Sequence, residues 1–393
     1  MKRLAIITTH PIQYNAPMFK MLAERGHIEV KVFYTWGEAA INKYDPGFGK
    51  HIEWDIPLLK GYSFCFVKNI AAVPGSNSFK GIDNPTLIKE VKNWKADVVL
   101  VYGWSFKSHL KAIRYFHKKI PILFRGDSTL LTEKKGLRKF ARTLFLKWVY
   151  SHVDYASFVG LQNKAYYIKH GLKEHQLVLA HHAVDNNRFA QPDEEYQESA
   201  KKWRQEMGVQ PHELTILFAG KFEEVKNPGF IIDFARKMKG LPIKFILAGN
   251  GPLEKELKTL SVNSQNILFL DFQNQLKMPV VYRLCDLFIL PSKSETWGLS
   301  VNEAMACGKA VLVSDRCGCA TDLVVNGHNG YVFNINRSND LLNNIKDLLV
   351  NKERVKIMGM ASSKIVEDFS FLNTARAIET TMMAIFTSNT NAK

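Results

Sequence analysis

The sequence contains few cysteines and no long hydrophobic run, and both absences restrict what the chain can be. Only five of its 393 residues are cysteine, at irregular spacing, so we expect neither a disulfide framework nor a zinc site. This cysteine usage favours the reducing cytoplasm. No run of 18 apolar residues occurs, so no membrane-spanning helix is expected. The apolar stretch after Met1 is short and ends at His10-Pro11, which predicts a first buried strand rather than a signal peptide.

Acidic residues are scarce in the first half of the chain. Residues 1–190 contain 29 Lys and Arg but only 14 Asp and Glu, whereas residues 191–393 contain 24 and 23. Nearly all of the net charge of +16 therefore lies in the first half. Such an asymmetry indicates an anionic partner, which can be a membrane surface, a phosphorylated acceptor or nucleic acid. No DNA-binding or RNA-binding motif is present, so nucleic acid is the least expected of the three.

Strand and helix patterns alternate through most of the chain, and the strands are almost continuously apolar. This pattern predicts parallel sheets covered on both faces. We expect an α/β fold with two tandem Rossmann-like, doubly wound domains facing a cleft, and ligands of such sheets bind beyond the carboxyl ends of the strands. The predicted divisions are a first domain at 1–190, a polar linker with a helix at 191–212, a second domain at 213–365, and a C-terminal helix and tail at 366–393, whose return to the first domain is left open.

The segment between Glu295 and Glu303 is the most informative part of the sequence. An apolar strand precedes it and a helical pattern follows, which predicts a tight turn at Gly298 and a helix start. Free N–H groups at a helix start can hold an anion, and each carboxylate can accept hydrogen bonds from a hydroxylated ring. A nucleoside diphosphate sugar offers two such rings and a phosphate group. The amides that can bind the phosphate belong to Trp297, Gly298 and Leu299.

Two lysines, Lys221 and Lys226, lie in a loop after another predicted strand, and Pro228 suits the first turn of the helix that follows. Two ammonium groups beside a helix N-terminus can neutralise a diphosphate, although two solvated surface lysines are the commoner case. The sequence has no Asp-x-Asp pair, which commonly holds a divalent ion on a nucleotide diphosphate. We therefore expect no metal and no cofactor.

Four further residues are candidates for the functional site, although each can also have a purely structural role. Phe272 ends a predicted strand and can meet a nucleobase, but large aromatic side chains are as often part of the core. His10 and Gln13 lie where the first strand meets the first helix, a place that Pro11 alone can also explain. Asp127 follows a first-half strand, where it can position or deprotonate an acceptor hydroxyl or simply cap a turn.

A basic amphipathic helix is predicted at 134–148, without any acidic residue. Such a helix can lie on an anionic bilayer, or it can pack its apolar face on the sheet and show a basic surface to water. We favour packing on the sheet, because core helices with one apolar face are the common case. The face expected to be buried consists of Leu137, Phe140, Ala141, Leu144, Phe145 and Trp148.

Taken together, these motifs resemble the GT-B glycosyltransferases, in particular glycosyltransferase family 4, the glycosyl transferases group 1 set. The resemblance implies a retaining, metal-independent transfer of a sugar from a nucleotide-sugar donor to a glycan or lipid-linked acceptor, in surface polysaccharide or glycolipid synthesis. The first domain would then be the acceptor side and the second would bind the nucleotide sugar. The matching segments are 218–228, 247–252, 286–306 with its two glutamates eight residues apart, 327–331 and 178–189.

The resemblance also implies residue roles. Glu295 would bind the hydroxyls of the donor sugar and Glu303 the ribose, while the two lysines and the 297–299 amides would hold the diphosphate. Lys221 stands where the family often has Arg, and Arg125-Gly-Asp127 stands where many members have a His, which leaves an acceptor-side role of Asp127 open. Attachment to the inner face of a membrane stays open for this cytoplasmic protein. So do two other functions: another GT-B-like enzyme, such as a nucleotide-sugar epimerase or a phosphorylase, and a basic protein that binds anionic lipid or nucleic acid.

Overall fold

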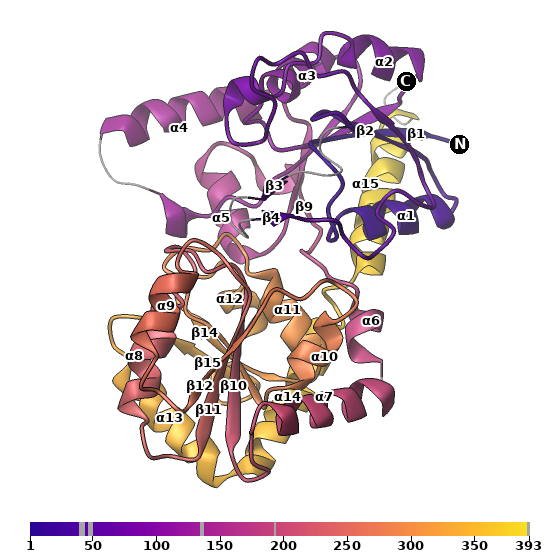
Figure 1. The fold of residues 1–393 in the computed structure, drawn as a ribbon. Helices are drawn as coiled ribbons and strands as arrows, with labels where there is room; N and C mark the ends of the chain where they lie inside the picture. Colours follow the sequence, from indigo (N-terminus) through magenta and orange to yellow (C-terminus); the bar gives the residue numbers. More distant parts are fainter. Residues whose placement is uncertain (39–43, 46–49, 134–136, 192–193, 391–393) are drawn as a thin grey trace. The chain divides into compact units, whose positions relative to one another are not determined.

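The structure is a computed structural model in which the chain forms two compact units (Figure 1). The first unit combines the N-terminal part of the chain with its C-terminal helix, and the second contains most of the remainder. The unit limits are 1–43, 57–182 and 371–393 for the first, and 44–56 and 183–370 for the second. The structure describes residues 1–38, 44–45, 50–133, 137–191 and 194–390.

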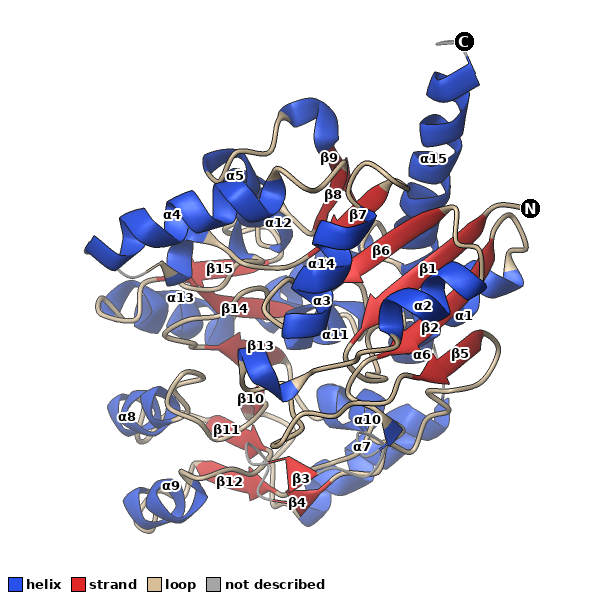
Figure 2. Cartoon of the chain, turned by 90° about the horizontal axis from the view of Figure 1, so that it is seen from above, coloured by secondary structure: helices blue, strands red, loops and turns tan. Residues whose placement is uncertain are grey.

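All strands of the first sheet lie parallel to their neighbours (Figure 2). The chain first adds strands on one side of β1 and later on the other side, so the order reverses between β1 and β6. A reversal of this kind is the switch point at which doubly wound sheets bind ligands. Across the sheet the strands are β5 (Ser63–Phe66), β2 (Glu29–Tyr34), β1 (Arg3–Thr8), β6 (Val98–Tyr102), β7 (Ile122–Arg125), β8 (Tyr155–Phe158) and β9 (Leu177–Leu179).

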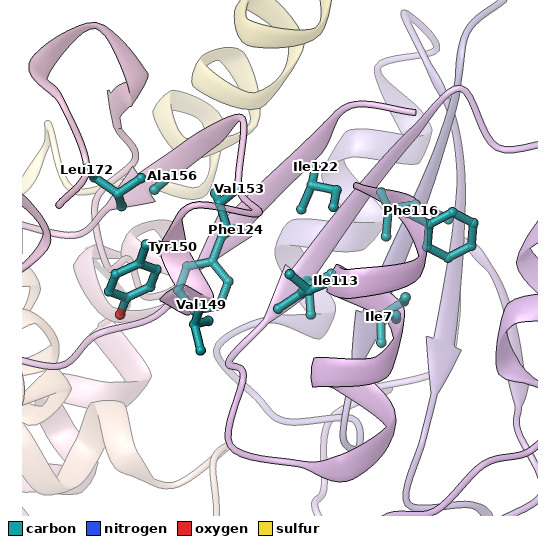
Figure 3. Close-up of a cluster of buried hydrophobic side chains, with 14 of the residues drawn as sticks. Ile7, Ile113, Phe116, Ile122, Phe124, Val149, Tyr150, Val153, Ala156 and Leu172 are labelled. Carbon is teal, nitrogen blue, oxygen red and sulfur yellow. The ribbon is translucent and has the colours of Figure 1, made fainter. Parts of the chain in front are cut away.

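A large apolar core covers one face of this sheet (Figure 3). Ile113 and Phe116 of helix α3 and Val149 of helix α4 pack on strand residues such as Phe124, and all of them are buried. Because helices cover the sheet, its strands are apolar along most of their length, as the sequence predicts. The helices of this unit are α1 (Ala16–Glu24), α2 (Leu87–Asn93), α3 (Lys107–Phe116), α4 (Leu137–Tyr150), α5 (Leu161–Lys169) and α15 (Phe371–Thr390), with short 3-10 turns η2 (Phe79–Gly81), η3 (Leu130–Thr132) and η4 (Glu174–Gln176).

Helix α15 belongs to the first unit although the residues just before it belong to the second. It packs against α1 and β9. The guanidinium of Arg25, at the end of α1, donates hydrogen bonds of 2.9 Å to both carboxylate oxygens of Glu379 on α15. The chain therefore returns to its first sheet after it has completed the second.

The second sheet is also parallel throughout, and its order reverses between β10 and β13. Across the sheet the strands are β12 (Ile267–Leu270), β11 (Ile243–Ala248), β10 (Leu214–Ala219), β13 (Leu287–Leu290), β14 (Ala310–Ser314) and β15 (Gly330–Phe333). The helices are α6 (Asn186–Ala190), α7 (Glu194–Glu206), α8 (Gly229–Lys237), α9 (Glu254–Leu260), α10 (Met278–Arg283), α11 (Leu299–Ala306), α12 (Ala320–Leu323), α13 (Asn339–Val350) and α14 (Lys352–Val366). A two-stranded hairpin, β3 (Tyr44–Asp45) with β4 (Lys50–His51), is grouped with this unit.

The predicted α/β architecture is confirmed, because two parallel sheets with helices follow one another along the chain. Helix α7 lies within the polar stretch at 191–212, of which residues 192 and 193 fall outside the described part. Over the described residues, no helix combines the length and the apolar character that crossing a bilayer requires.

The predicted packing of α4 is wrong. Among its described side chains, those of Leu146, Val149 and Tyr150 are buried, on the face opposite to the one that we expected to be in the core. The sequence pattern misled because α4 is apolar on two sides, and periodicity alone does not say which side meets the sheet. The basic residues Lys134 and Lys135 lie outside the described residues, and the side chains of 137–139 are not described.

Candidate functional site

The loops after β10 and β13 lie next to each other because these strands pair in the middle of the second sheet. Both loops leave the carboxyl ends of their strands at the switch point. Two hydrogen bonds join them: the Lys293 backbone N–H donates to the Val225 carbonyl at 2.9 Å, and the Asn227 side-chain amide donates to the Pro291 carbonyl at 3.1 Å. The two loops thus form one connected surface where doubly wound sheets bind ligands.

This surface brings together two of the residues predicted from the sequence. The ammonium of Lys226, on the loop after β10, forms an ion pair with the carboxylate of Glu295, on the loop after β13. Both side chains are largely buried, with exposed fractions of 26% and 15%. Lys221, the other predicted cation, lies 4.0 Å from the carboxylate of Glu223 within its own loop.

The backbone of Glu295 is fixed by the loop that follows β14. Its N–H donates to the Arg316 carbonyl at 3.1 Å, and its carbonyl accepts from the Gly318 N–H at 3.0 Å. The Cys319 N–H also donates to the Trp297 carbonyl at 3.1 Å. The Glu295 carboxylate, which faces Lys226, therefore projects from a loop whose backbone is fixed by hydrogen bonds at Glu295 and at Trp297.

Helix α11 begins directly after this loop, as predicted. Gly298 precedes it with φ of 108°, a left-handed conformation that glycine adopts most readily. A Cβ at this position would lie 2.8 Å from Cδ2 of Leu290. As the N-cap residue, Gly298 has no side chain that could accept from the first N–H groups of the helix. These groups, beginning at Leu299, present the positive end of the helix dipole.

Glu303 lies one turn into α11 and is buried. Its carboxylate accepts a hydrogen bond of 2.7 Å from the Tyr282 hydroxyl of α10. The indole N–H of Trp297 donates to the Asn302 side chain at 2.9 Å, also in a buried position. The Trp297 side chain therefore anchors the loop to the helix, and only the backbone of this residue is a candidate for anion binding.

Phe272, the predicted nucleobase contact, follows β12 and is half-buried. Its ring lies 6.5 Å from that of Trp54, in the segment that precedes Pro57 and is grouped with the second unit. The Asn274 side chain donates to the Glu53 carbonyl at 2.7 Å, which holds the same segment in place. Phe272 is thus accompanied by a second aromatic residue, Trp54, which the sequence did not single out.

In the first unit, Asp127 lies after β7, as expected, and faces a histidine. Its carboxylate is 3.8 Å from Nε2 of His182, which follows β9. The buried Arg125 holds the two strand ends together, since its guanidinium donates to the carbonyl oxygens of Ala180 at 2.8 Å and His181 at 3.1 Å. The loops that carry Asp127 and His182 are therefore fixed relative to each other.

His10 lies at the end of β1, with its Nδ1 2.9 Å from the Thr9 hydroxyl and its ring edge-on to Trp36. Gln13 is half-buried in the turn before α1. A second histidine of this unit, the buried His109 of α3, has its Nε2 2.8 Å from the Thr35 hydroxyl. Burial lowers the pKa of His109 to about 4, so this imidazole is neutral at physiological pH.

The structure thus places the predicted residues in two groups, one in each unit. Lys226 and Glu295 meet directly, and Gly298, Leu299 and Glu303 follow on the loop and helix beside them. Asp127 lies at the carboxyl edge of the first sheet, as do His10 and Gln13. Sequence reasoning missed Tyr282, Trp54 and His182. Of these three residues, only His182 could have been found from the sequence. It stands next to another histidine just after the strand at 177–179, and polar residues at a strand end are candidates for a functional site.

Residues 199–364 match the family model described as glycosyl transferases group 1. The resemblance to this family is confirmed over that part of the chain. An uncharacterized glycosyltransferase of Methanocaldococcus jannaschii is 31% identical over 157 residues, which are 39% of this chain and 44% of that protein. A D-inositol 3-phosphate glycosyltransferase of Rhodococcus erythropolis is 28% identical over 186 residues, covering 44% and 41%. The chain thus spans less than half the length of these curated relatives.

Solved structures resemble the chain over almost its whole length. A sucrose-phosphate synthase from Thermosynechococcus elongatus has a TM-score of 0.75 at 17% identity, covering 99% of this chain and all of the other. The Anabaena protein HepE, in complex with UDP and glucose, has a TM-score of 0.69 at 16% identity, covering 98% of this chain and all of the other. These likenesses establish the fold and confirm the predicted GT-B class.

Proposed function

We propose that this protein is a glycosyltransferase that moves a sugar from a nucleoside diphosphate sugar to a hydroxylated glycan or lipid-linked acceptor. The observation that carries the proposal is the Lys226–Glu295 pair, on the two loops at the switch point of the second sheet, one of which leads into the start of α11. The group 1 match covers this region, and the similar Anabaena structure holds UDP and glucose.

In this proposal, Lys226, Lys221 and the first N–H groups of α11 hold the diphosphate. An ammonium group has three donors, so the contact of Lys226 with Glu295 leaves others that can reach phosphate oxygens. These cationic groups stabilise the leaving diphosphate as negative charge develops on it. No step in this scheme requires a metal ion.

Glu295 is proposed to accept hydrogen bonds from hydroxyls of the transferred sugar, and Glu303 from the ribose. Tyr282 already donates to one carboxylate oxygen of Glu303, which fixes the direction of this side chain. Phe272 and Trp54 are proposed to border the base. On the acceptor side, Asp127 with His182 is proposed to orient the attacking hydroxyl, beside His10 and Gln13.

The proposed transfer is retaining, metal-independent and part of surface polysaccharide or glycolipid synthesis, carried out in the cytoplasm at the inner face of a membrane. The direct test incubates the protein with a panel of nucleotide sugars and hydroxylated acceptors and follows both nucleoside diphosphate and glycosylated product. NMR of the new anomeric centre tests retention, and a parallel reaction in EDTA tests metal independence.

The outcomes of this test separate the proposal from the other functions that the sequence left open. We expect a glycosylated product that requires both donor and acceptor. An isomerised nucleotide sugar without any product would replace the proposal with an epimerase, and phosphate-dependent sugar release would replace it with a phosphorylase. Salt-sensitive DNA binding that persists after Lys221→Ala and Glu303→Ala, without turnover, would point to a basic binding protein.

A further inference from the structure

Helix α4 turns an apolar face toward solvent, opposite to the face that packs in the core. Three of its residues stand four positions apart, at 140, 144 and 148, and the fourth, at 145, lies beside them, so they form one continuous row along the helix. Scattered exposed apolar residues are ordinary on protein surfaces, but a continuous patch marks a contact surface. The exposed residues are Phe140 (69% exposed), Leu144 (53%), Phe145 (38%) and Trp148 (40%).

Aromatic contacts hold this row in place. The Phe145 ring lies edge-on to Trp104 at 5.3 Å and beside Trp148 at 5.6 Å. The guanidinium of Arg114, on α3, lies 5.5 Å from the Trp148 ring. The exposed face is therefore an ordered aromatic surface that combines apolar rings with a cation.

Positive charge surrounds the row. Arg142 and Lys147 lie on opposite sides of it, both exposed, and Arg142 also donates a hydrogen bond of 3.2 Å to the Tyr166 hydroxyl. Between Glu133 and Asp154 the sequence contains no acidic residue. Glu133 itself is bound by Lys169 and His170, which offsets its charge. The charged residues of α4 are thus all positive, as are those of α3, the helix that carries Arg114.

We infer that the outer face of α4 is a docking surface for an anionic lipid bilayer. A helix with a Trp- and Phe-bearing apolar face and basic flanks lies in the interfacial plane, with its rings among the acyl chains and its cations at the headgroups. Long basic side chains can bury their stems while their charged ends stay at the lipid surface. Charge complementarity favours a negatively charged surface, and the docking itself does not depend on the proposed enzymatic activity.

The position of α4 also connects this surface to the acceptor side, a step that rests on the proposed function. Because β7 and β8 are parallel, the chain leaves the carboxyl edge of the sheet near Asp127 and returns through α4 to the opposite edge, where β8 begins. Figure 1 shows α4 at the outside of the first unit, so docking through this helix would hold that unit, which carries the proposed acceptor residues, at the bilayer. That arrangement favours a lipid-anchored hydroxyl as the acceptor over a freely soluble one.

Flotation with vesicles tests the docking surface directly. The wild-type chain is mixed with phosphatidylcholine vesicles that contain or lack phosphatidylglycerol, and compared with the double variant Phe140→Ser/Leu144→Ser. A matched control is Ile70→Ser/Val73→Ser, which removes two exposed apolar residues of the same unit, 53% and 81% exposed. We expect binding to the phosphatidylglycerol vesicles alone, at least about tenfold weaker for the α4 variant and unchanged for the control.

Other results would overturn the inference. These are absence of wild-type binding to the anionic vesicles, equal binding by the α4 variant, or equal loss in both variants. Light scattering during gel filtration gives the remaining contrary outcome: a wild-type dimer that the α4 substitutions convert to a monomer would make this face an interface between two copies. Nucleotide affinity without vesicles should be equal in all variants, so a failure of docking and a failure of the proposed activity remain distinguishable.

Discussion

Lys226 and Glu295 form an ion pair across 69 residues of sequence, at the point where the order of the second sheet reverses. The pair links the two loops that a ligand of this sheet would contact first. Two consequences follow, one for each partner of the pair.

Replacement of Glu295 by Ala should abolish transfer while the protein still folds. The carboxylate projects from a loop whose backbone is held by Arg316 and Gly318, so its removal leaves the loop fixed. Loss of a group that contacts the reacting sugar should lower kcat/KM by about 100-fold or more. Transfer assays measure this, and near-normal turnover in a variant with an unchanged melting curve would refute the role of Glu295.

Replacement of Lys226 by Met should weaken nucleoside diphosphate binding by about tenfold or more, because a charge-assisted hydrogen bond to phosphate is lost. Lys293→Met is the matched control, since Lys293 also pairs with a glutamate, Glu224 at 2.9 Å, but is half-exposed. Calorimetric titration with UDP and other nucleoside diphosphates compares the two variants. Equal affinities would argue that Lys226 has only a structural role.

Gly298→Ala should destabilise the second unit and reduce activity together. The substitution places a Cβ 2.8 Å from Leu290 and imposes φ of 108° on an L residue, which costs about 1–3 kcal/mol from backbone strain alone. Gly208→Ala serves as the control, because Gly208 also has a positive φ, 72°, but a Cβ added there would have no described residue within 4 Å apart from Gly208 itself and its two chain neighbours. Urea unfolding should show a larger loss for Gly298→Ala, and equal losses would mean that the close approach is relieved at no cost.

His109 should make the first unit less stable in mild acid. Burial lowers its pKa from an ordinary 6.5 to about 4, against the opposing effect of its hydrogen bonds to the carbonyl oxygens of Gly103 and Tyr102. Between pH 6.5 and pH 4 the unfolded chain therefore binds a proton at His109 that the folded chain does not. The free energy of unfolding is thus unaffected by this group above pH 6.5 and falls as the pH drops toward 4. The loss reaches about 3 kcal/mol at the acid end.

Urea unfolding at neutral pH and near pH 5 checks this expectation. The variant His109→Gln cannot titrate, so its stability should change less between the two conditions than that of the wild type. An identical pH dependence in both proteins would show that other groups control acid stability.

Asp127→Asn should separate the two sides of the reaction. If Asp127 acts with His182 on the acceptor hydroxyl, transfer should fall by about 100-fold, while nucleoside diphosphate affinity stays unchanged because the donor residues belong to the second unit. A pH profile of transfer that loses its acidic limb in the variant would support direct action of the carboxylate. Wild-type transfer rates would restrict Asp127 to capping.

The apolar strand pattern in the sequence predicts both the parallel sheets and the proximity of Lys226 to Glu295. Loops after neighbouring parallel strands lie at one edge, so two residues distant in sequence can be placed together once the strands are recognised. The same reasoning does not reach Tyr282 or His182. Tyr282 lies on a helix and donates a hydrogen bond to Glu303. His182 follows β9, which is two strands away from β7, the strand that precedes Asp127. Both contacts depend on side-chain directions that periodicity does not specify.

Helix α4 shows a different limit of sequence reasoning. Its apolar residues fall on two faces, and the face with more aromatic residues was the natural choice for the core. The structure instead buries Leu146, Val149 and Tyr150. Only tertiary context distinguishes a core face from an exposed one when both are apolar.

The return of α15 to α1 orders events during synthesis on the ribosome. N-terminal domains usually fold first, as soon as they emerge. Here Arg25 and its partner Glu379 are separated by 354 residues, so the first unit is complete only after the last helix has left the ribosome, when residues 183–370 have already emerged. The unit whose first residues are synthesised earliest is therefore the last to be completed.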